Sequence, residues 1–148
     1  MYEFLSYCVR DVMSRPVVVG PEASLAEVER ILEKSRFNAL PVVDTHGQLV
    51  GVVTTLDLLK AFAFDDESII PPYGDIMRRP VTAVMSPDPA TVPPRQPLTR
   101  LLEKMLKTRN KSFPVVDEDG RLVGMVARED VMRALRRAAA GERPTASD

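Results

Sequence analysis

The sequence predicts an α+β fold, of α/β type, made of two pseudo-symmetric β-α-β-β-α repeats. Three observations predict it. The 148 residues suffice for one compact domain or for two small halves that share a core. One stretch of the sequence occurs twice. Each copy alternates short β-branched or apolar runs with longer segments whose apolar residues have helical spacing.

The repeat is clearest where residues 41–53 recur as residues 114–126, at an offset of 73. Ten of nineteen residues are identical between 41–59 and 114–132. Two copies are too few for a solenoid, so we interpret them as a duplicated unit. The predicted domains are a first repeat at 8–64, a linker at 65–77, a second repeat at 78–138 and a flexible tail at 139–148.

In the first copy, the β-branched run 16–19 predicts a strand. Ser24 and Glu27 have the spacing of a capping box, which predicts the start of a helix. Residues 40–43 and 49–53 predict two strands, joined by a hairpin turn at 44–47. A second helix is expected from about Thr55, with these side chains partly buried: Leu56, Leu59, Ala63 and Phe64.

The second copy repeats this order. Pro97 suits the first turn of a helix, where its missing N–H costs little. The apolar stripe of that helix is Leu98, Leu101, Leu102, Met105 and Leu106. Residues 117–120 predict a second hairpin turn, and a final helix is expected from about Arg128 to Ala139. The segment 65–79 contains more charge and proline and is interpreted as a linker.

Composition excludes several classes of protein. Cys8 is the only cysteine, so an internal disulfide and a Cys-rich zinc site are excluded. The longest stretch without Asp, Glu, Lys or Arg has twelve residues, whereas a spanning helix needs about twenty. With no signal peptide read at the N-terminus, we expect a cytoplasmic protein that does not enter a membrane.

The net charge of −1 argues against a nucleic-acid partner. The charge is nevertheless uneven, at −5 for residues 1–74 and +4 for residues 75–148. Solvated helix faces explain this difference, and so does a basic wall that attracts an anionic ligand.

Thr54 and Asp57 lie where the third predicted strand of the first copy meets its second helix. Free N–H groups and a threonine hydroxyl there suit a phosphate. The Asp57 carboxylate only accepts hydrogen bonds, so it suits two neighbouring sugar hydroxyls. The same pair is also an ordinary helix cap. Recurrence of the aspartate as Asp130 favours a nucleotide site.

Three motifs occur in the same order in both copies. They are Val-Met-Ser at 12–14 and 84–86, Pro-Val-Val-Asp at 41–44 and 114–117, and a Gly-x-x-Thr-x-x-Asp signature ending at Asp57 with a variant ending at Asp130. Together they resemble a tandem pair of cystathionine β-synthase (CBS) domains, a Bateman module, over residues 9–137. The resemblance implies two repeats packed sheet to sheet, with two clefts that bind AMP, ADP, ATP or S-adenosylmethionine.

In the family, each cleft takes its ribose-binding Asp from one repeat and much of its base pocket from the other. Carried over here, the first cleft is formed by Thr54, Asp57, Met85, Ala90, Lys111, Ser112 and Phe113. The second cleft is formed by Met13, Val17, Asn38, Ala39, Leu40, Arg128 and Asp130.

The two predicted clefts are unequal. Ala127 replaces the expected threonine, and Asn38 stands in the place of Lys111, where the family has a basic residue that meets phosphate. Arg128 compensates only if its side chain points inward. We therefore expect the phosphorylated ligand in the first cleft, and a less charged adenosine compound or nothing in the second.

The predicted function is a stand-alone regulatory protein that binds an adenosine ligand and signals to an unidentified partner protein. The resemblance also implies a homodimer, for which we expect exposed contacts at Leu58, Phe62, Val131 and Leu135. With one His and one Cys, with no Ser/His/Asp set and with no phosphate loop, an enzyme is not expected. The alternative is a ligand-free dimerisation or scaffold module in which Asp57 and Asp130 are only helix caps.

Overall fold

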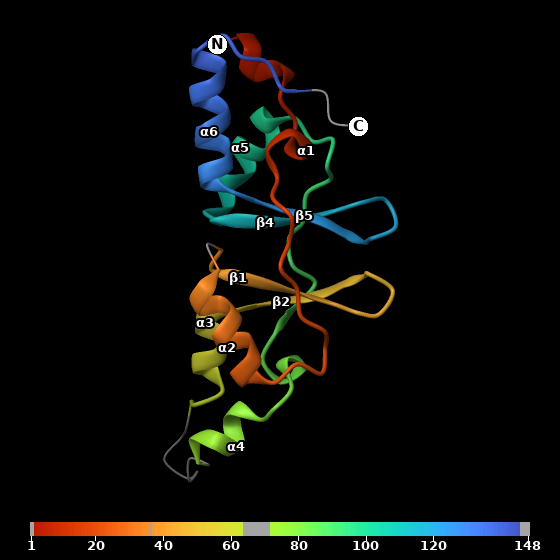
Figure 1. Ribbon diagram of the computed structural model, residues 1–148, viewed down its shortest axis with the longest axis vertical. Helices are drawn as coiled ribbons and strands as arrows, with labels where there is room; N and C mark the ends of the chain where they lie inside the picture. The colour runs from red at the N-terminus through yellow and green to blue at the C-terminus, as the bar shows by residue number, and fades with distance from the viewer. Residues whose placement is uncertain (1, 36, 64–71, 146–148) are drawn as a thin grey trace. The chain divides into compact units, whose positions relative to one another are not determined.

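The computed structural model describes residues 2–35, 37–63 and 72–145. It forms two compact units, drawn in Figure 1. The first-repeat unit is Val17–Pro89, and the second-repeat unit combines Met1–Pro16 with Ala90–Asp148. Residues 8–16, the start of the predicted first repeat, therefore pack in the second-repeat unit, and residues 78–89, the start of the predicted second repeat, pack in the first-repeat unit.

The first-repeat unit is built on a three-stranded antiparallel sheet in the order β1-β2-β3. Its strands are β1 (Ala39–Val43), β2 (Leu49–Thr54) and β3 (Ser86–Pro87). Its helices are α2 (Leu25–Lys34), α3 (Thr55–Lys60), α4 (Tyr73–Met77) and a short 3-10 helix at Val81–Ala83. Its core consists of Val19, Leu25, Val28, Leu40, Val42, Val53, Leu58, Ile76, Met77 and Val81.

The second-repeat unit contains an antiparallel hairpin of β4 (Ser112–Val116) and β5 (Leu122–Ala127). Helices α5 (Leu98–Thr108) and α6 (Arg128–Ala139) lie on one side of this hairpin (Figure 1). A 3-10 helix (Tyr2–Ser6) and α1 (Val9–Val12) come from the N-terminal segment. Between these two elements, the buried Tyr7 donates its hydroxyl hydrogen to the Glu142 carbonyl at 3.1 Å. This bond joins the N-terminal segment to the residues that follow α6.

Both predicted hairpins are confirmed. Gly47 and Gly120 have φ angles of 81° and 80°, which an L side chain rarely adopts, so each turn needs its glycine. In the first turn, Asp44 Oδ1 accepts from the backbone N–H groups of His46 and Gln48. The last helix is confirmed at Arg128–Ala139.

The predicted strand at 16–19 is wrong. Only Val19 pairs, in a single parallel bridge to Val42, whereas Val17 and Val18 are exposed. The Ser24 cap forms in part, since its hydroxyl accepts from the Glu27 N–H at 3.2 Å. Cys8 is half-buried. Burial is the main cause that raises the pKa of its thiol, and the hydrogen bond to Asp11 raises that pKa further.

The predicted faces of two helices are also wrong. Leu56 and Leu59 are 63% and 62% exposed, whereas Leu58 and Val131, predicted as exposed contacts, are buried. Successive helix residues are rotated by about 100°, so the side of α3 that buries Asp57 and Leu58 turns Leu56 and Leu59 outward.

Phe64 and residues 65–71 of the predicted linker lie outside the described residues. Farther along the same segment, α4 buries Ile76 and Met77 in the core of the first-repeat unit.

Candidate functional site

Thr54 and Asp57 form a complete capping box at the start of α3. Thr54 Oγ1 accepts from the Asp57 N–H at 3.2 Å. In return, Asp57 Oδ2 accepts from the Thr54 N–H at 2.9 Å and from its hydroxyl at 3.1 Å. This arrangement fixes the orientation of a carboxylate that is 3% exposed.

The second oxygen of Asp57 is held more loosely. Lys60 Nζ and Ser86 Oγ both lie 3.5 Å from Asp57 Oδ1, which is the limit of a hydrogen bond. A carboxylate oxygen can accept more than one hydrogen bond, so Oδ1 has capacity for further donors. The structure therefore supplies a fixed anionic acceptor with one weakly occupied oxygen.

Gly51 brings β3 close to this carboxylate. A Cβ at Gly51 would lie 2.9 Å from the Ser86 carbonyl oxygen and 2.8 Å from Met85 Sδ, so only glycine fits without a shift. Met85 thereby lies in the same unit as Thr54 and Asp57, although the predicted domain boundaries assign it to the second repeat. Ser86 was missed as a site residue. Its recurrence after methionine, at Ser14 and Ser86, was the available signal.

The remaining predicted residues of the first cleft belong to the second-repeat unit: Ala90, Lys111, Ser112 and Phe113. Phe113 is fully buried in the core, with Lys104 Nζ 5.1 Å from the ring centroid. Lys111 directly precedes β4 and is exposed. Its backbone carbonyl accepts from the Arg128 N–H at 3.1 Å, and its ammonium group has no partner among the described residues.

Asp130 occupies the corresponding place at the start of α6. Its Oδ2 accepts from the Ala127 N–H at 2.7 Å, and its Oδ1 accepts from Arg133 Nη2. Ala127 has no side-chain oxygen, so the cap lacks the threonine half seen at Thr54. Arg128 turns instead to the end of α5, where its Nη2 donates to the Arg109 carbonyl at 2.7 Å.

Met13 lies in the same unit as Arg128 and Asp130. A Cβ at Gly124 would be 2.6 Å from Met13 Sδ and 3.2 Å from the Ser14 carbonyl oxygen, which repeats the close approach at Gly51. The other predicted residues of the second cleft belong to the first-repeat unit: Val17, Asn38, Ala39 and Leu40. Among them the Leu40 side chain is buried in the core, whereas Val17 is exposed.

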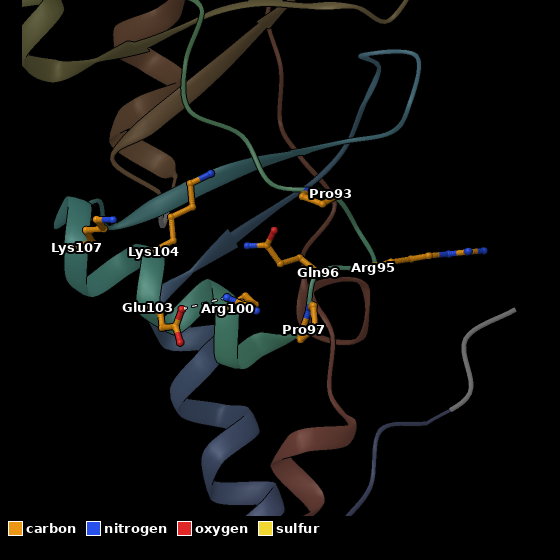
Figure 2. Close-up of a pocket in the computed structure, with 8 residues that line it drawn as sticks. All are labelled: Pro93, Arg95, Gln96, Pro97, Arg100, Glu103, Lys104 and Lys107. Carbon is orange, nitrogen blue, oxygen red and sulfur yellow. Dashed lines mark ion pairs between the residues drawn. The ribbon is translucent and has the colours of Figure 1, made fainter.

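A hollow beside α5, shown in Figure 2, contains none of the predicted ligand residues. It is lined by Pro93, Arg95, Gln96, Pro97, Arg100, Glu103, Lys104 and Lys107. Arg100 pairs with Glu103 at 3.8 Å, and Lys104 Nζ donates to the Thr91 carbonyl at 2.7 Å. Because most of these side chains are exposed, the hollow is an open basic surface and not an enclosed site.

Within residues 2–35, 37–63 and 72–145, no three or more His, Cys, Asp or Glu side chains gather where a metal ion could be held. No helix in the same ranges is long and apolar enough to cross a bilayer.

Comparison with known proteins identifies the repeated unit. The sequence model of the CBS domain matches residues 9–64 and 74–137, one match in each repeat. An L-aspartate semialdehyde sulfurtransferase of Methanocaldococcus jannaschii is 36% identical over 126 residues, covering 84% of this chain and only 22% of the relative. The chloroplastic CBS domain-containing protein CBSX2 of Arabidopsis thaliana is 30% identical over 140 residues, covering 79% of this chain and 57% of the relative.

Two solved structures resemble the fold and contain adenosine compounds. CBSX2 in complex with AMP has a TM-score of 0.75 and 29% identity, covering 90% of this chain and 98% of the other. The CBS domain pair of protein MJ0100, in complex with 5′-methylthioadenosine and S-adenosyl-L-methionine, has a TM-score of 0.69 and 31% identity. It covers 89% of this chain and 98% of the other.

Proposed function

Because this chain belongs to the CBS domain family, we propose that it is a regulatory module that binds an adenosine-containing ligand and signals to a partner protein. The candidate ligands are AMP, ADP, ATP and S-adenosylmethionine. AMP and S-adenosyl-L-methionine occur in the complexes of similar structures. The observation in this chain that carries the proposal is the loosely held Oδ1 of Asp57.

The chemistry of Asp57 suits a ribose. The 2′- and 3′-hydroxyls of a ribose are neighbouring donors, and a carboxylate is an acceptor that can receive both. Thr54 donates two hydrogen bonds to the Asp57 carboxylate and accepts a third from the Asp57 N–H, so Asp57 keeps one orientation and little side-chain entropy is lost when a ligand binds. Ser86 Oγ, at 3.5 Å from Asp57 Oδ1, is an additional polar contact for the sugar.

Lys111 supplies the proposed phosphate contact. Its ammonium group is exposed and, among the described residues, is not engaged in an ion pair. We retain Met85, Ala90, Ser112 and Phe113 as proposed contacts on the basis of the family resemblance. Phe113 and Leu40 have buried side chains, so their contribution in either site would come from the backbone.

Enzyme activity is not part of the proposal. The relatives with enzyme names match this chain over only 22% to 26% of their own length. In a regulatory role, the ligand would shift the equilibrium between two arrangements of the protein. The free energy of that shift cannot exceed the difference between the ligand's binding free energies for the two arrangements.

The test measures binding of each candidate ligand by titration calorimetry and thermal shift. At a hundred times its Kd, a ligand stabilises the folded state by about 2.7 kcal/mol. Asp57→Asn should weaken binding by about tenfold or more, because a hydrogen bond to a charged acceptor is worth about 1.5–3 kcal/mol. Asp75→Asn, which alters an exposed carboxylate on α4, is the matched control and should bind normally.

Two outcomes would contradict the proposal. If the folded protein shows no shift with any of the four ligands, the ligand-free scaffold becomes the better assignment. If Asp57→Asn remains folded and binds as tightly as the parent, Asp57 acts as a helix cap only.

We also propose that the module is a homodimer, a state that the family resemblance implies. The groove between α5 and α6 is the contact we favour. It has a volume of about 480 Å³ and is lined by Leu102, Met105, Leu106, Arg109, Arg128, Val131, Met132 and Leu135. Leu106 and Met132 are exposed at its edges, so a second copy would remove them from water.

A further inference from the structure

The two repeats hold their aspartates with different cations. At the repeat offset of 73 residues, Asp57 corresponds to Asp130, and Lys60 corresponds to Arg133. Lys60 approaches Asp57 Oδ1 only to 3.5 Å, and its own side chain is 62% exposed. The ammonium group can therefore move into solvent and leave Oδ1 to another donor.

Arg133 holds Asp130 more firmly. Arg133 Nη2 donates to Asp130 Oδ1, and the Asp130 side chain is fully buried. A guanidinium group is planar, is always charged at neutral pH, and makes stronger directional bonds to a carboxylate than an ammonium group makes. Arg133 thus occupies the oxygen that corresponds to the loosely held Oδ1 of Asp57.

The other contacts of Asp130 add to this difference. Its Oδ2 is engaged by the Ala127 N–H at 2.7 Å. Arg128, at the first position of α6, donates to the Arg109 carbonyl at 2.7 Å, whereas Arg133 donates to Asp130 Oδ1. A ribose that approached Asp130 would have to displace a charge-assisted hydrogen bond before it could donate its own.

We propose that Arg133 determines the ligand specificity of the second repeat by keeping Asp130 from a ribose diol. This inference rests on the proposed function, since it assumes that Asp57 binds the ribose of an adenosine ligand. It assigns the inequality between the repeats to one side chain at position 133, in addition to the missing hydroxyl at Ala127.

Reciprocal exchange of the two cations tests the inference in the full-length chain, with AMP as the probe. Arg133→Lys gives the second repeat the cation of the first. In an Asp57→Asn background, where the first site is impaired, this change should raise the affinity for AMP by up to about fivefold, as expected for loss of one partly exposed ion pair. Lys60→Arg, made alone, should lower the affinity of the first site by a similar factor.

Titration calorimetry gives both the affinity and the number of sites, and thermal unfolding without ligand shows whether each variant is folded. If Arg133→Lys does not fold, Arg133→Gln serves in its place, and Lys60→Arg tests the idea independently. If the parent protein binds AMP and neither exchange changes the affinity by more than twofold, the inference is overturned and the proposed function stands. If neither the parent protein nor any exchange variant binds AMP, both are overturned for this ligand.

Discussion

At the scale of single residues, Gly51 and Gly124 decide how closely the Met-Ser segments approach the two aspartates. Each glycine faces a methionine and the carbonyl oxygen of the following serine. The distance to the closest backbone atom differs between the two positions. A Cβ would lie 2.9 Å from the Ser86 oxygen at Gly51 and 3.2 Å from the Ser14 oxygen at Gly124.

We predict that Gly51→Ala destabilises the protein more than Gly124→Ala does. At both positions the closest atom is a methionine sulfur, but at Gly51 the Ser86 backbone oxygen also lies within 2.9 Å of the added Cβ. That oxygen cannot move without shifting β3, so the cost of Gly51→Ala should be about 1–3 kcal/mol, as for other overpacked sites. At Gly124 the closest atom is the flexible end of Met13, which can rotate away. Urea unfolding of both variants measures the two costs, and an equal loss or the reverse order would contradict the argument.

At the scale of elements, α3 and α6 begin with unequal caps. Thr54 accepts the Asp57 N–H at 3.2 Å, whereas Ala127 has no oxygen with which to accept the corresponding N–H of Asp130. Both helices keep the reciprocal bond from the N-cap N–H to the aspartate. The difference between the two caps is therefore one hydroxyl group.

We predict that Thr54→Ala lowers the free energy of unfolding by about 1 kcal/mol, the usual cost of losing a hydroxyl cap. Ala127→Ser should raise it by about 0.5–1 kcal/mol, because it supplies the missing acceptor. Thermal unfolding without ligand measures both changes. A loss of stability in Ala127→Ser would show that the buried position has no room for the hydroxyl.

Most elements could be predicted because local rules determine them. The hairpins follow from glycine at the positive-φ positions 47 and 120, the amphipathic spacing predicts α5, and the repeat predicts α6. The side of α3 that is buried could not be predicted, because six residues with several leucines fit either face. The run 16–19 has strand composition, yet only Val19 finds a pairing partner.

The candidate site could be predicted only in part. Thr54 and Asp57 follow from capping chemistry and from the repeat. The positions of Ser86 and Arg133 relative to the aspartates depend on the approach of β3 and on the side-chain conformations of α6, and neither follows from spacing. The repeat offset does pair Arg133 with Lys60, but only the geometry shows that the two cations hold their aspartates differently.

At the scale of the whole molecule, an apolar surface is left without a partner. In the described part of the second-repeat unit, Leu106 is 73% exposed and Met132 is 52% exposed, and both line the groove between α5 and α6. Partly buried Leu102 and Leu135 continue the same surface inward to the core. A second copy that seats on this groove would bury these side chains, and about 25 cal/mol is gained per Å² of apolar surface removed from water.

We therefore predict that the protein is a dimer at micromolar concentration and that Leu106→Glu makes it monomeric. A carboxylate in the groove would have to be desolvated on association without a matched partner, which is costly. Light scattering coupled to gel filtration measures the mass of each species. Leu5→Glu, which replaces another exposed leucine of the same unit, is the control and should remain dimeric. A monomeric parent protein would contradict the homodimer. A dimeric Leu106→Glu variant would place the contact on another surface, because an interface centred on this groove cannot retain a buried, unpaired charge.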